Sequence, residues 1–322
     1  MKVWLSVLAV LASQAAYTLA SAQNWPTRAV RIIVPFAPGG GNDIAARLVA
    51  QHMNDSFGQT AVVDNRPGAG STLGTDVAAK ASPDGYTLLV THNAIAINET
   101  LYPKLPYDAE KDFAQVILIG STTNTLVVNP KVAAKSTKEL IALAKAKAGA
   151  LNYASTGAGG TSHLAMEYFK LSTGTNLAHI PYKGTGPALI DLTSGQVQVM
   201  ISALPGTISF IQGKRVIALA TTGAKRSAFL PELPTLAESG VPGYEFDTWY
   251  GLHAPAKVSK DIVVKLNAAL AKALGTPAVK EQLFKAGLEA QGGTPEAFRK
   301  FMISEIQKMA KIIKASGAKP DV

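Results

Sequence analysis

The sequence contains no cysteine, which excludes disulfide bonds, thiolate metal sites and a cysteine nucleophile. It also contains no run of five or more Lys or Arg residues, and its basic residues are not interleaved with aromatic ones. The formal net charge of +9 is therefore scattered, and we expect no nucleic-acid partner. Beyond the N-terminus, no apolar stretch reaches the length of a membrane span.

The N-terminus itself has the pattern of a secretory signal. Lys2 supplies the positive charge, residues 3–12 form an apolar segment, and Ala20-Ser21-Ala22 offers small residues for cleavage. The pattern predicts a signal peptide over residues 1–22 and a mature chain that begins near Gln23. An uncleaved anchor is the alternative. We therefore expect an exported protein.

After this signal, short apolar strands alternate with helical segments, which is typical of the α/β class with parallel strands. Residues 42–57 place Ile44, Leu48 and Met53 on one helical face. Two α/β units follow one another, and helical segments end the chain. We expect strands at 30–36, 60–64, 86–91, 116–120, 126–128, 178–181, 197–202 and 216–221, and helices at 42–57, 74–81, 137–148, 187–195, 207–212, 260–274, 278–285 and 295–315.

Two Gly-rich corners occur, each where a predicted strand turns into a helix. The first is Pro38-Gly39-Gly40-Gly41, and the second is Ser155-Thr156-Gly157-Ala158-Gly159-Gly160-Thr161-Ser162. Glycine lets the backbone approach a ligand closely, and a helix N-terminus presents free N–H groups and a partial positive charge. Because open α/β sheets bind ligands at the carboxyl ends of their strands, the two corners predict a cleft that holds an anion from both sides.

Neither corner fits a nucleotide-binding motif, because Ile44 and Ser162 stand where the third glycine of a dinucleotide fingerprint is required. His163 and Glu167 have the spacing of a metal pair, but nothing marks a third ligand. We expect no metal and no cofactor, and we expect His163 to face the cleft. No Gly-x-Ser-x-Gly nucleophile elbow is present, so the sequence does not predict an enzyme.

Three further positions have specific expectations. Asp43 lies in the first helical turn, where its charge would repel a bound anion, so we expect it to brace the first corner. Lys183 follows a strand and is either a cation near the cleft or a solvated turn residue. Trp249 and Tyr250 are core residues by default, and one of them could instead wall the cleft.

The motifs of the chain resemble those of the periplasmic solute-binding receptors of tripartite tricarboxylate transporters, the Bug receptor family. The resemblance covers essentially the whole mature chain. It rests on the first corner with its flanks, Pro35-Phe36-Ala37-Pro38-Gly39-Gly40-Gly41-Asn42-Asp43-Ile44-Ala45-Ala46-Arg47, and on the segments 65–70, 83–88, 181–184, 224–227 and 233–238.

The resemblance implies a two-domain type II periplasmic binding protein fold of the α/β class, with a ligand cleft between the domains. Domain 1 would consist of residues 23–121 and 226–322, and domain 2 of residues 122–225. Two crossing strands would link the domains near residues 120–126 and 220–225.

The resemblance also implies that main-chain amides and ordered waters hold a carboxylated ligand between the two corners. Two integral membrane transporter subunits would accept this ligand in the periplasm. The candidate ligand-binding residues are Phe36, Ala37, Pro38, Gly39, Gly40, Thr91, His92, Asn93, Ser155, Thr156, Gly157, Gly160, Thr161, Ser162, His163, Lys183, Ser202 and Ala203.

One departure from the family pattern concerns ligand charge. Gln198 and Ser202 stand where the family often has acids, and an acid near the cleft would suit a ligand ammonium. We therefore expect a small organic mono- or dicarboxylate, aliphatic or aromatic, rather than an amino acid. The alternative function is an extracytoplasmic hydrolase that uses the Gly-rich corners as an oxyanion hole.

Overall fold

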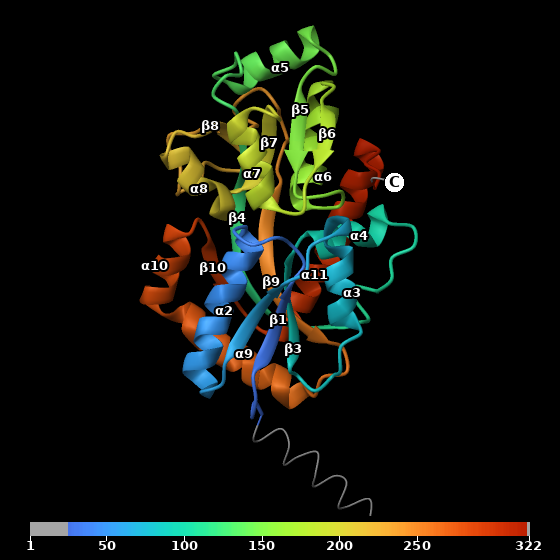
Figure 1. The fold of residues 1–322 in the computed structure, drawn as a ribbon, viewed down its shortest axis with the longest axis vertical. Coiled ribbons are helices and arrows are strands. Elements are labelled where there is room, and N and C mark those ends of the chain that lie inside the picture. The colour runs from blue at the N-terminus through green and yellow to red at the C-terminus, as the bar shows by residue number, and fades with distance from the viewer. Residues whose placement is uncertain (1–24, 321–322) are drawn as a thin grey trace, which may run out of the picture.

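The computed structural model describes residues 25–320 (Figure 1). The predicted signal peptide, residues 1–22, and the predicted mature N-terminus at Gln23 lie outside the described residues. Within residues 25–320, no single helix has the length and apolarity of a membrane span. Two consecutive helices, α9 (Lys260–Gly275) and α10 (Pro277–Lys285), have that length and apolarity only when taken together, and they meet at a bend of 78°.

The first domain contains a sheet whose first strands are parallel. β1 (Val30–Val34) pairs in parallel with β2 (Ala61–Asn65) and β3 (Thr87–His92), and β3 then pairs antiparallel with β9 (Asp247–Pro255). Ile32 and Ile33 of β1 belong to two different hydrophobic clusters. Both faces of the sheet are therefore covered, which explains why β1 is apolar apart from Arg31, whose guanidinium pairs with Asp64 of β2.

The helices of this domain pack on the two faces of its sheet. α2 (Gly41–Phe57) contacts α9 on one face, and α4 (Ala94–Leu101) contacts α11 (Pro295–Ser316) on the other. The remaining helical elements are η1 (Ala69–Ser71), α3 (Thr72–Ala79) and α10.

The second domain repeats the parallel arrangement. β5 (Asn152–Ser155) pairs in parallel with β6 (Ala178–Pro181) and β7 (Val199–Ala203). Its helices are α5 (Thr137–Ala146), α6 (Thr161–Thr173), α7 (Thr185–Ser194) and α8 (Leu204–Gln212).

One of the connections between the two domains is a single long strand. β4 (Phe113–Val128) pairs antiparallel with β9 and β10 (Glu289–Gly292) in its first part, and with β7 and β8 (Ile217–Thr221) in its second part. In Figure 1, β4 and β9 run along the long axis between the domains. The prediction of two separate strands at 116–120 and 126–128 was therefore wrong. The polar stretch between them resembles a turn in sequence, but most of its side chains are hydrogen-bonded, as when Thr122 Oγ1 donates to the Gly287 carbonyl at 2.6 Å.

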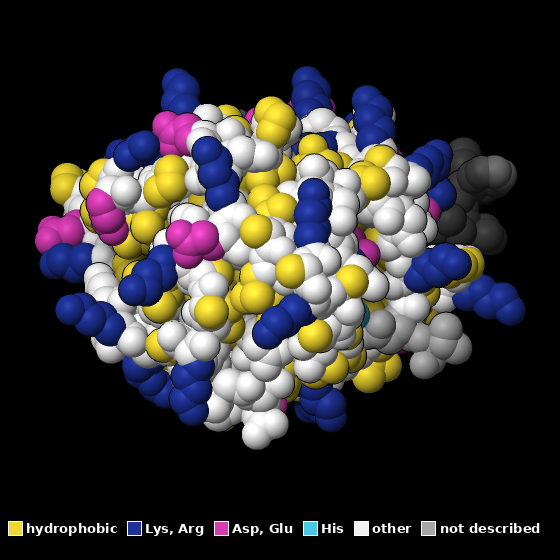
Figure 2. All heavy atoms as spheres, turned by 90° about the horizontal axis from the view of Figure 1, so that it is seen from above, with side chains coloured by type: hydrophobic (Ala, Val, Ile, Leu, Met, Phe, Trp, Pro, Cys, Tyr) yellow, Lys and Arg dark blue, Asp and Glu magenta, His cyan; other side chains and the backbone are white. Residues whose placement is uncertain are grey.

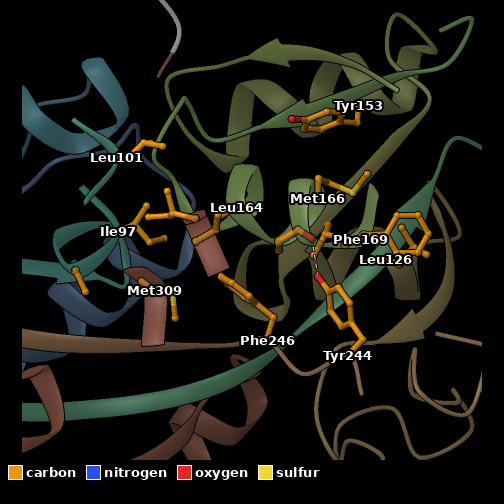
Figure 3. Packing of buried hydrophobic residues seen from close by; sticks show 14 of the residues in the cluster. Ile97, Leu101, Leu126, Tyr153, Leu164, Met166, Phe169, Tyr244, Phe246 and Met309 are labelled. Atoms are coloured by element: carbon orange, nitrogen blue, oxygen red, sulfur yellow. Dashed lines mark hydrogen bonds between the residues drawn. The ribbon is translucent and has the colours of Figure 1, made fainter. Parts of the chain in front are cut away.

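After β8, the chain up to residue 246 makes contacts with elements of the second domain. Leu236 donates its N–H to the Thr221 carbonyl at 2.8 Å, which adds a short stretch beside β8. The Tyr244 hydroxyl donates to the Ala165 carbonyl of α6 at 2.6 Å, and Figure 3 shows this ring beside Phe246 and α6. α11 also contacts α6, so one hydrophobic cluster extends from α4 and α11 into the second domain.

Candidate functional site: the cleft between the domains

The two Gly-rich corners meet at a small cavity between the domains. The cavity has a volume of about 20 Å³, counted as the space open to the centre of a water-sized sphere. This volume is enough for roughly one water. The cleft between the domains is therefore closed in this structure. The cavity is lined by Phe36, Gly40, Gly41, Asn42, His92, Thr156, Thr161, Ser162, Thr185, Ala203, Thr248 and Tyr250.

Four helix N-termini converge on this cavity. α2 begins after Gly40, α6 after Gly160, α7 after Gly184 and α8 after Ala203, and none of these four cap residues accepts a side-chain capping hydrogen bond. First-turn N–H groups without caps are available to a ligand, and the partial positive charges of the four ends add together. The arrangement suits a carboxylate held by main-chain amides.

Sequence analysis identified two of these four helix ends. The α7 and α8 N-termini carry weaker signals, namely Gly184 before α7 and Pro205 in the first turn of α8. Proline in a first helical turn, directly after a strand, could have marked the α8 end.

Close approach explains the glycines at the corners. A Cβ at Gly41 would overlap the Tyr250 hydroxyl, and a Cβ at Gly206 would lie 2.7 Å from Thr185 Cγ2. A Cβ at Gly40 would lie 3.1 Å from Thr185 Oγ1. Glycine is needed here because backbone from one domain reaches side chains on another element without room for a methyl group.

His92 lines the cavity as a neutral ring. Its Nδ1 accepts the N–H of Ala94 at 3.0 Å and lies 3.1 Å from Thr161 Oγ1 across the cleft. The ring also packs on Phe36, with centroids 4.6 Å apart. Burial lowers the pKa of His92 to about 3, so this side chain supplies no positive charge at neutral pH.

Asp43 braces the first corner, as predicted. Its carboxylate accepts the N–H of Gly39 at 3.2 Å, the side-chain amide of Asn65 at 3.2 Å and the guanidinium of Arg47 at 2.9 Å. These bonds hold the loop from behind, and Asp43 is not among the residues that line the cavity.

A second cavity of about 250 Å³ opens beside the first. It shares Phe36 and Thr156 with the first cavity, and Lys183 is exposed at its edge. Neither cavity has an Asp or Glu among its lining residues within the described chain. The second cavity is lined by Phe36, Gly68, Ala69, Gly70, Ser71, Tyr102, Thr156, Gly157, Ala158, Pro181, Tyr182 and Lys183.

The structure thus brings nine of the predicted site residues to these cavities. Phe36, Gly40, His92, Thr156, Thr161, Ser162 and Ala203 line the first, and Gly157 and Lys183 line the second. The other nine lie in or near the corners without lining either cavity: Ala37, Pro38, Gly39, Thr91, Asn93, Ser155, Gly160, His163 and Ser202.

Several of these nine have polar groups engaged elsewhere. Asn93 accepts the Trp249 N–H at 3.0 Å and donates to the Asp247 carbonyl at 3.1 Å. Ser155 Oγ lies 2.6 Å from His179 Nε2, and Ser202 accepts from Thr207 at 2.8 Å. Buried polar side chains at strand ends need such partners, and sequence alone does not distinguish this need from ligand binding.

His163 lies in a ring stack rather than at the cavity wall. Its ring is parallel to that of His179 at 4.4 Å, and His179 in turn stacks on Tyr153 at 4.8 Å. Within residues 25–320, no three His, Cys, Asp or Glu side chains are close enough to hold a metal ion.

Of Trp249 and Tyr250, it is Tyr250 that lines the cleft. Successive side chains of β9 point to opposite faces, so Tyr250 walls the cleft while Trp249 enters the core. There the Trp249 indole N–H donates to Glu305 at 2.9 Å. Gly41, Asn42, Thr185 and Thr248 are the further lining residues of the first cavity that sequence analysis did not include.

Comparison with known proteins finds similarity over most of the chain. A family model described as the tripartite tricarboxylate transporter family receptor matches residues 45–318. Protein BugT of Bordetella pertussis is 39% identical over 301 residues, which cover 93% of this chain and 92% of BugT.

Solved structures show the same fold. R. palustris Rpa4515 with adipate is 36% identical with a TM-score of 0.90, over 92% of this chain and all of that one. MatC from Rhodopseudomonas palustris with bound malate is 32% identical with a TM-score of 0.86, over 90% of this chain and all of that one. The fold is therefore that of the two-domain periplasmic binding proteins, as the resemblance implied, and the chain belongs to the tripartite tricarboxylate transporter receptor family.

Proposed function

We propose that this protein captures a small organic carboxylate in the closed cleft and presents it to a membrane transporter. The observation that carries the proposal is the convergence of four uncapped helix N-termini on one cavity. Relatives whose structures contain adipate and malate support the same ligand class. Capture occurs by domain closure, and no bond is broken.

The ligand's carboxylate would sit among the helix N-termini, with its body extending past Phe36 and Thr156 into the second cavity. Both cavities border these two residues, which supports a continuous path. Lys183, exposed at the outer edge, would attract the far end of a dicarboxylate.

An amino group would fit this site poorly. No carboxylate lines either cavity in the described chain, and leaving an ammonium unpaired on burial costs several kcal/mol. The test is a thermal-shift panel of matched pairs: succinate with aspartate, glutarate with glutamate, and adipate with 2-aminoadipate. We expect the plain carboxylate of each pair to give the larger rise in melting temperature at equal concentration. Larger shifts from the amino acids would refute the preference, and no shift from any compound would refute the proposed function.

A hydrolase is disfavoured by the position of its most suitable nucleophile. Ser155 is bonded to His179, but the side chain is fully buried and lines neither cavity. We propose that the protein is not an enzyme. Mass spectrometry of a bound carboxylate or its ester before and after incubation should give unchanged masses.

The contacts of residues 234–246 indicate where the chain returns from the second domain to the first. Since Leu236 pairs beside β8 and Tyr244 bonds to α6, we propose that the second crossing lies at the start of β9. The first crossing stays within β4, near residues 120–126. Limited proteolysis combined with hydrogen exchange of the free and liganded protein would locate both hinges.

The partners would be two integral membrane subunits, and the site of action would be the periplasm. The signal pattern of residues 1–22 and the membership of the receptor family support both statements. Fractionation of cells that express the full chain should recover the processed protein in the periplasmic fraction.

A further inference from the structure

The positive charge of this protein is concentrated in one part of the chain. Residues 122–225 contain ten Lys and Arg residues but three Asp and Glu residues, a net charge of +7. Residues 25–121 and 226–320 together contain 20 basic and 18 acidic residues, a net charge of +2. The basic balance of the described chain is therefore mainly a property of residues 122–225, which form only a part of the second domain.

Most of these cations also lack an acidic partner. Of the ten in residues 122–225, Lys170 alone forms an ion pair within the described chain, with Glu167 at 2.7 Å. In the rest of the described chain, ion pairs with Asp or Glu are common. Uncompensated like charges repel one another, so their accumulation in one stretch of the chain is not explained by folding stability.

Half of the ten gather at the end of the second domain farthest from the first. This tip face, residues 129–151, consists of α5 and its two flanking loops. Figure 2 views the molecule from this end, and dark-blue basic side chains outnumber magenta acidic ones. The only acidic side chain of residues 129–151 is Glu139, which accepts the backbone N–H of Lys135. The exposed cations of the tip face are Lys131, Lys135, Lys138, Lys145 and Lys147.

A groove of about 280 Å³ lies in this face. Val132, Leu143 and Leu151 give it an apolar wall, and Lys131 and Lys147 contribute two cations to its lining. The position of Lys145 in the last turn of α5 suits the helix C-terminus, but that effect does not account for Lys131 or for the apolar groove.

We propose that the tip face docks an acidic segment of a protein partner, with an apolar side chain of that segment seated in the groove and its carboxylates beside Lys131 and Lys147. Unpaired cations supply charge complementarity and a faster encounter, and the apolar groove supplies contact area. A flat anionic lipid surface would use the lysines without needing the groove, which favours a protein. The assignment of this segment to the membrane subunits rests on the proposed function.

The test compares two double variants with equal changes in charge. Lys131→Glu with Lys147→Glu reverses the groove lysines. Lys257→Glu with Lys272→Glu is the control. Both lysines are exposed on the first domain and have no ion-pair partner in the described chain. Lys257 lies in a loop, as Lys131 does, and Lys272 lies at a helix end, as Lys147 does. Equilibrium binding is measured to right-side-out membrane vesicles with and without the two membrane subunits, and to protein-free vesicles of phosphatidylglycerol and phosphatidylethanolamine.

We expect the groove variant to bind subunit-containing vesicles at least tenfold more weakly than wild type, and the control variant less than twofold more weakly. Wild-type binding should also weaken as salt rises from about 50 to 300 mM. Equal losses in the two variants, no loss in either, or no wild-type binding would overturn the proposal, and so would equally strong binding to protein-free vesicles. A Lys138→Glu, Lys145→Glu variant provides a second test if the first folds poorly. The thermal-shift panel, measured on the same proteins, reports separately on ligand capture.

Discussion

The backbone N–H of Ala37 donates a hydrogen bond to the carbonyl of Lys183 at 2.9 Å, and this bond joins the first Gly-rich corner to the loop before α7. The Tyr102 hydroxyl makes a second such bridge to the Ala158 carbonyl at 3.0 Å. Both bonds require the domains to be in contact. Each contributes only about 1 kcal/mol, which is small beside the binding free energy of a ligand, so a ligand can shift the equilibrium between open and closed forms.

Loss of the Tyr102 bridge should therefore weaken ligand binding. We expect Tyr102→Phe to reduce affinity for the best carboxylate of the panel about three- to tenfold, mainly through faster dissociation, because the closed form loses a hydrogen bond that the open form does not make. Tyr168→Phe is the matched control, since its hydroxyl bonds to the Gly243 carbonyl at 3.4 Å, away from the cleft. Calorimetry that gives equal affinities for the two variants would contradict this reasoning.

The same closure predicts a change in overall shape. Because the first cavity, where the carboxylate would sit, has room for roughly one water, a ligand must enter it through a more open form. We expect small-angle scattering of the free protein to give a larger radius of gyration than scattering at saturating ligand. Superimposable curves would count against hinge closure, unless both curves match the closed structure.

Added bulk at the first corner should impair binding strongly. Gly41→Ala forces the Tyr250 hydroxyl to move in the cleft wall, and we expect a loss of more than about tenfold in affinity, roughly 1.4 kcal/mol. Gly275→Ala serves as the control, because a methyl group there meets no atom within 4 Å. Calorimetry measures the ligand affinity of both variants. An unchanged affinity for Gly41→Ala would contradict the prediction, because it would mean that Tyr250 can move without loss of binding.

The sequence predicted best those parts of the site that a few neighbouring residues determine. A strand end, several glycines and a helix start occur together at Gly40 and at Gly160, so both corners could be located before the structure. Asp43 was assigned correctly because an acid in a first helical turn has a simple electrostatic role. The family motifs then supplied the two-domain fold.

Long-range contacts were harder to predict. β4 was divided into two strands because the polar residues around Thr122 resemble a loop, and their hydrogen-bond partners lie over 100 residues away in sequence. Likewise, which of Trp249 and Tyr250 faces the cleft depends on the register of β9 against β3 and β4. The sequence of one strand does not reveal its register with its neighbours.

A pH-dependent prediction concerns Asp247 at the start of β9. Its buried Oδ1 has no hydrogen-bond partner in the described chain. Burial, together with Glu245, Glu289 and Glu305, raises its pKa to about 6 from 3.8, against a smaller opposing effect of Lys308. Since the folded state binds this proton more tightly than the unfolded state, the carboxyl destabilises the fold increasingly as pH rises from about 4 through 6.

We therefore expect Asp247→Asn to raise the free energy of unfolding at pH 7.5 by about 1–2 kcal/mol, and by much less at pH 4.5. His92 and His253 act in the opposite direction, because burial lowers their pKa values to about 3 and stability falls as pH drops below 6.5. Subtracting wild type from variant at each pH removes their effect. Urea unfolding provides the measurement, and Asp55→Asn at an exposed position is the control. If the gain of Asp247→Asn is equal at the two pH values, the buried carboxyl does not titrate as its surroundings require.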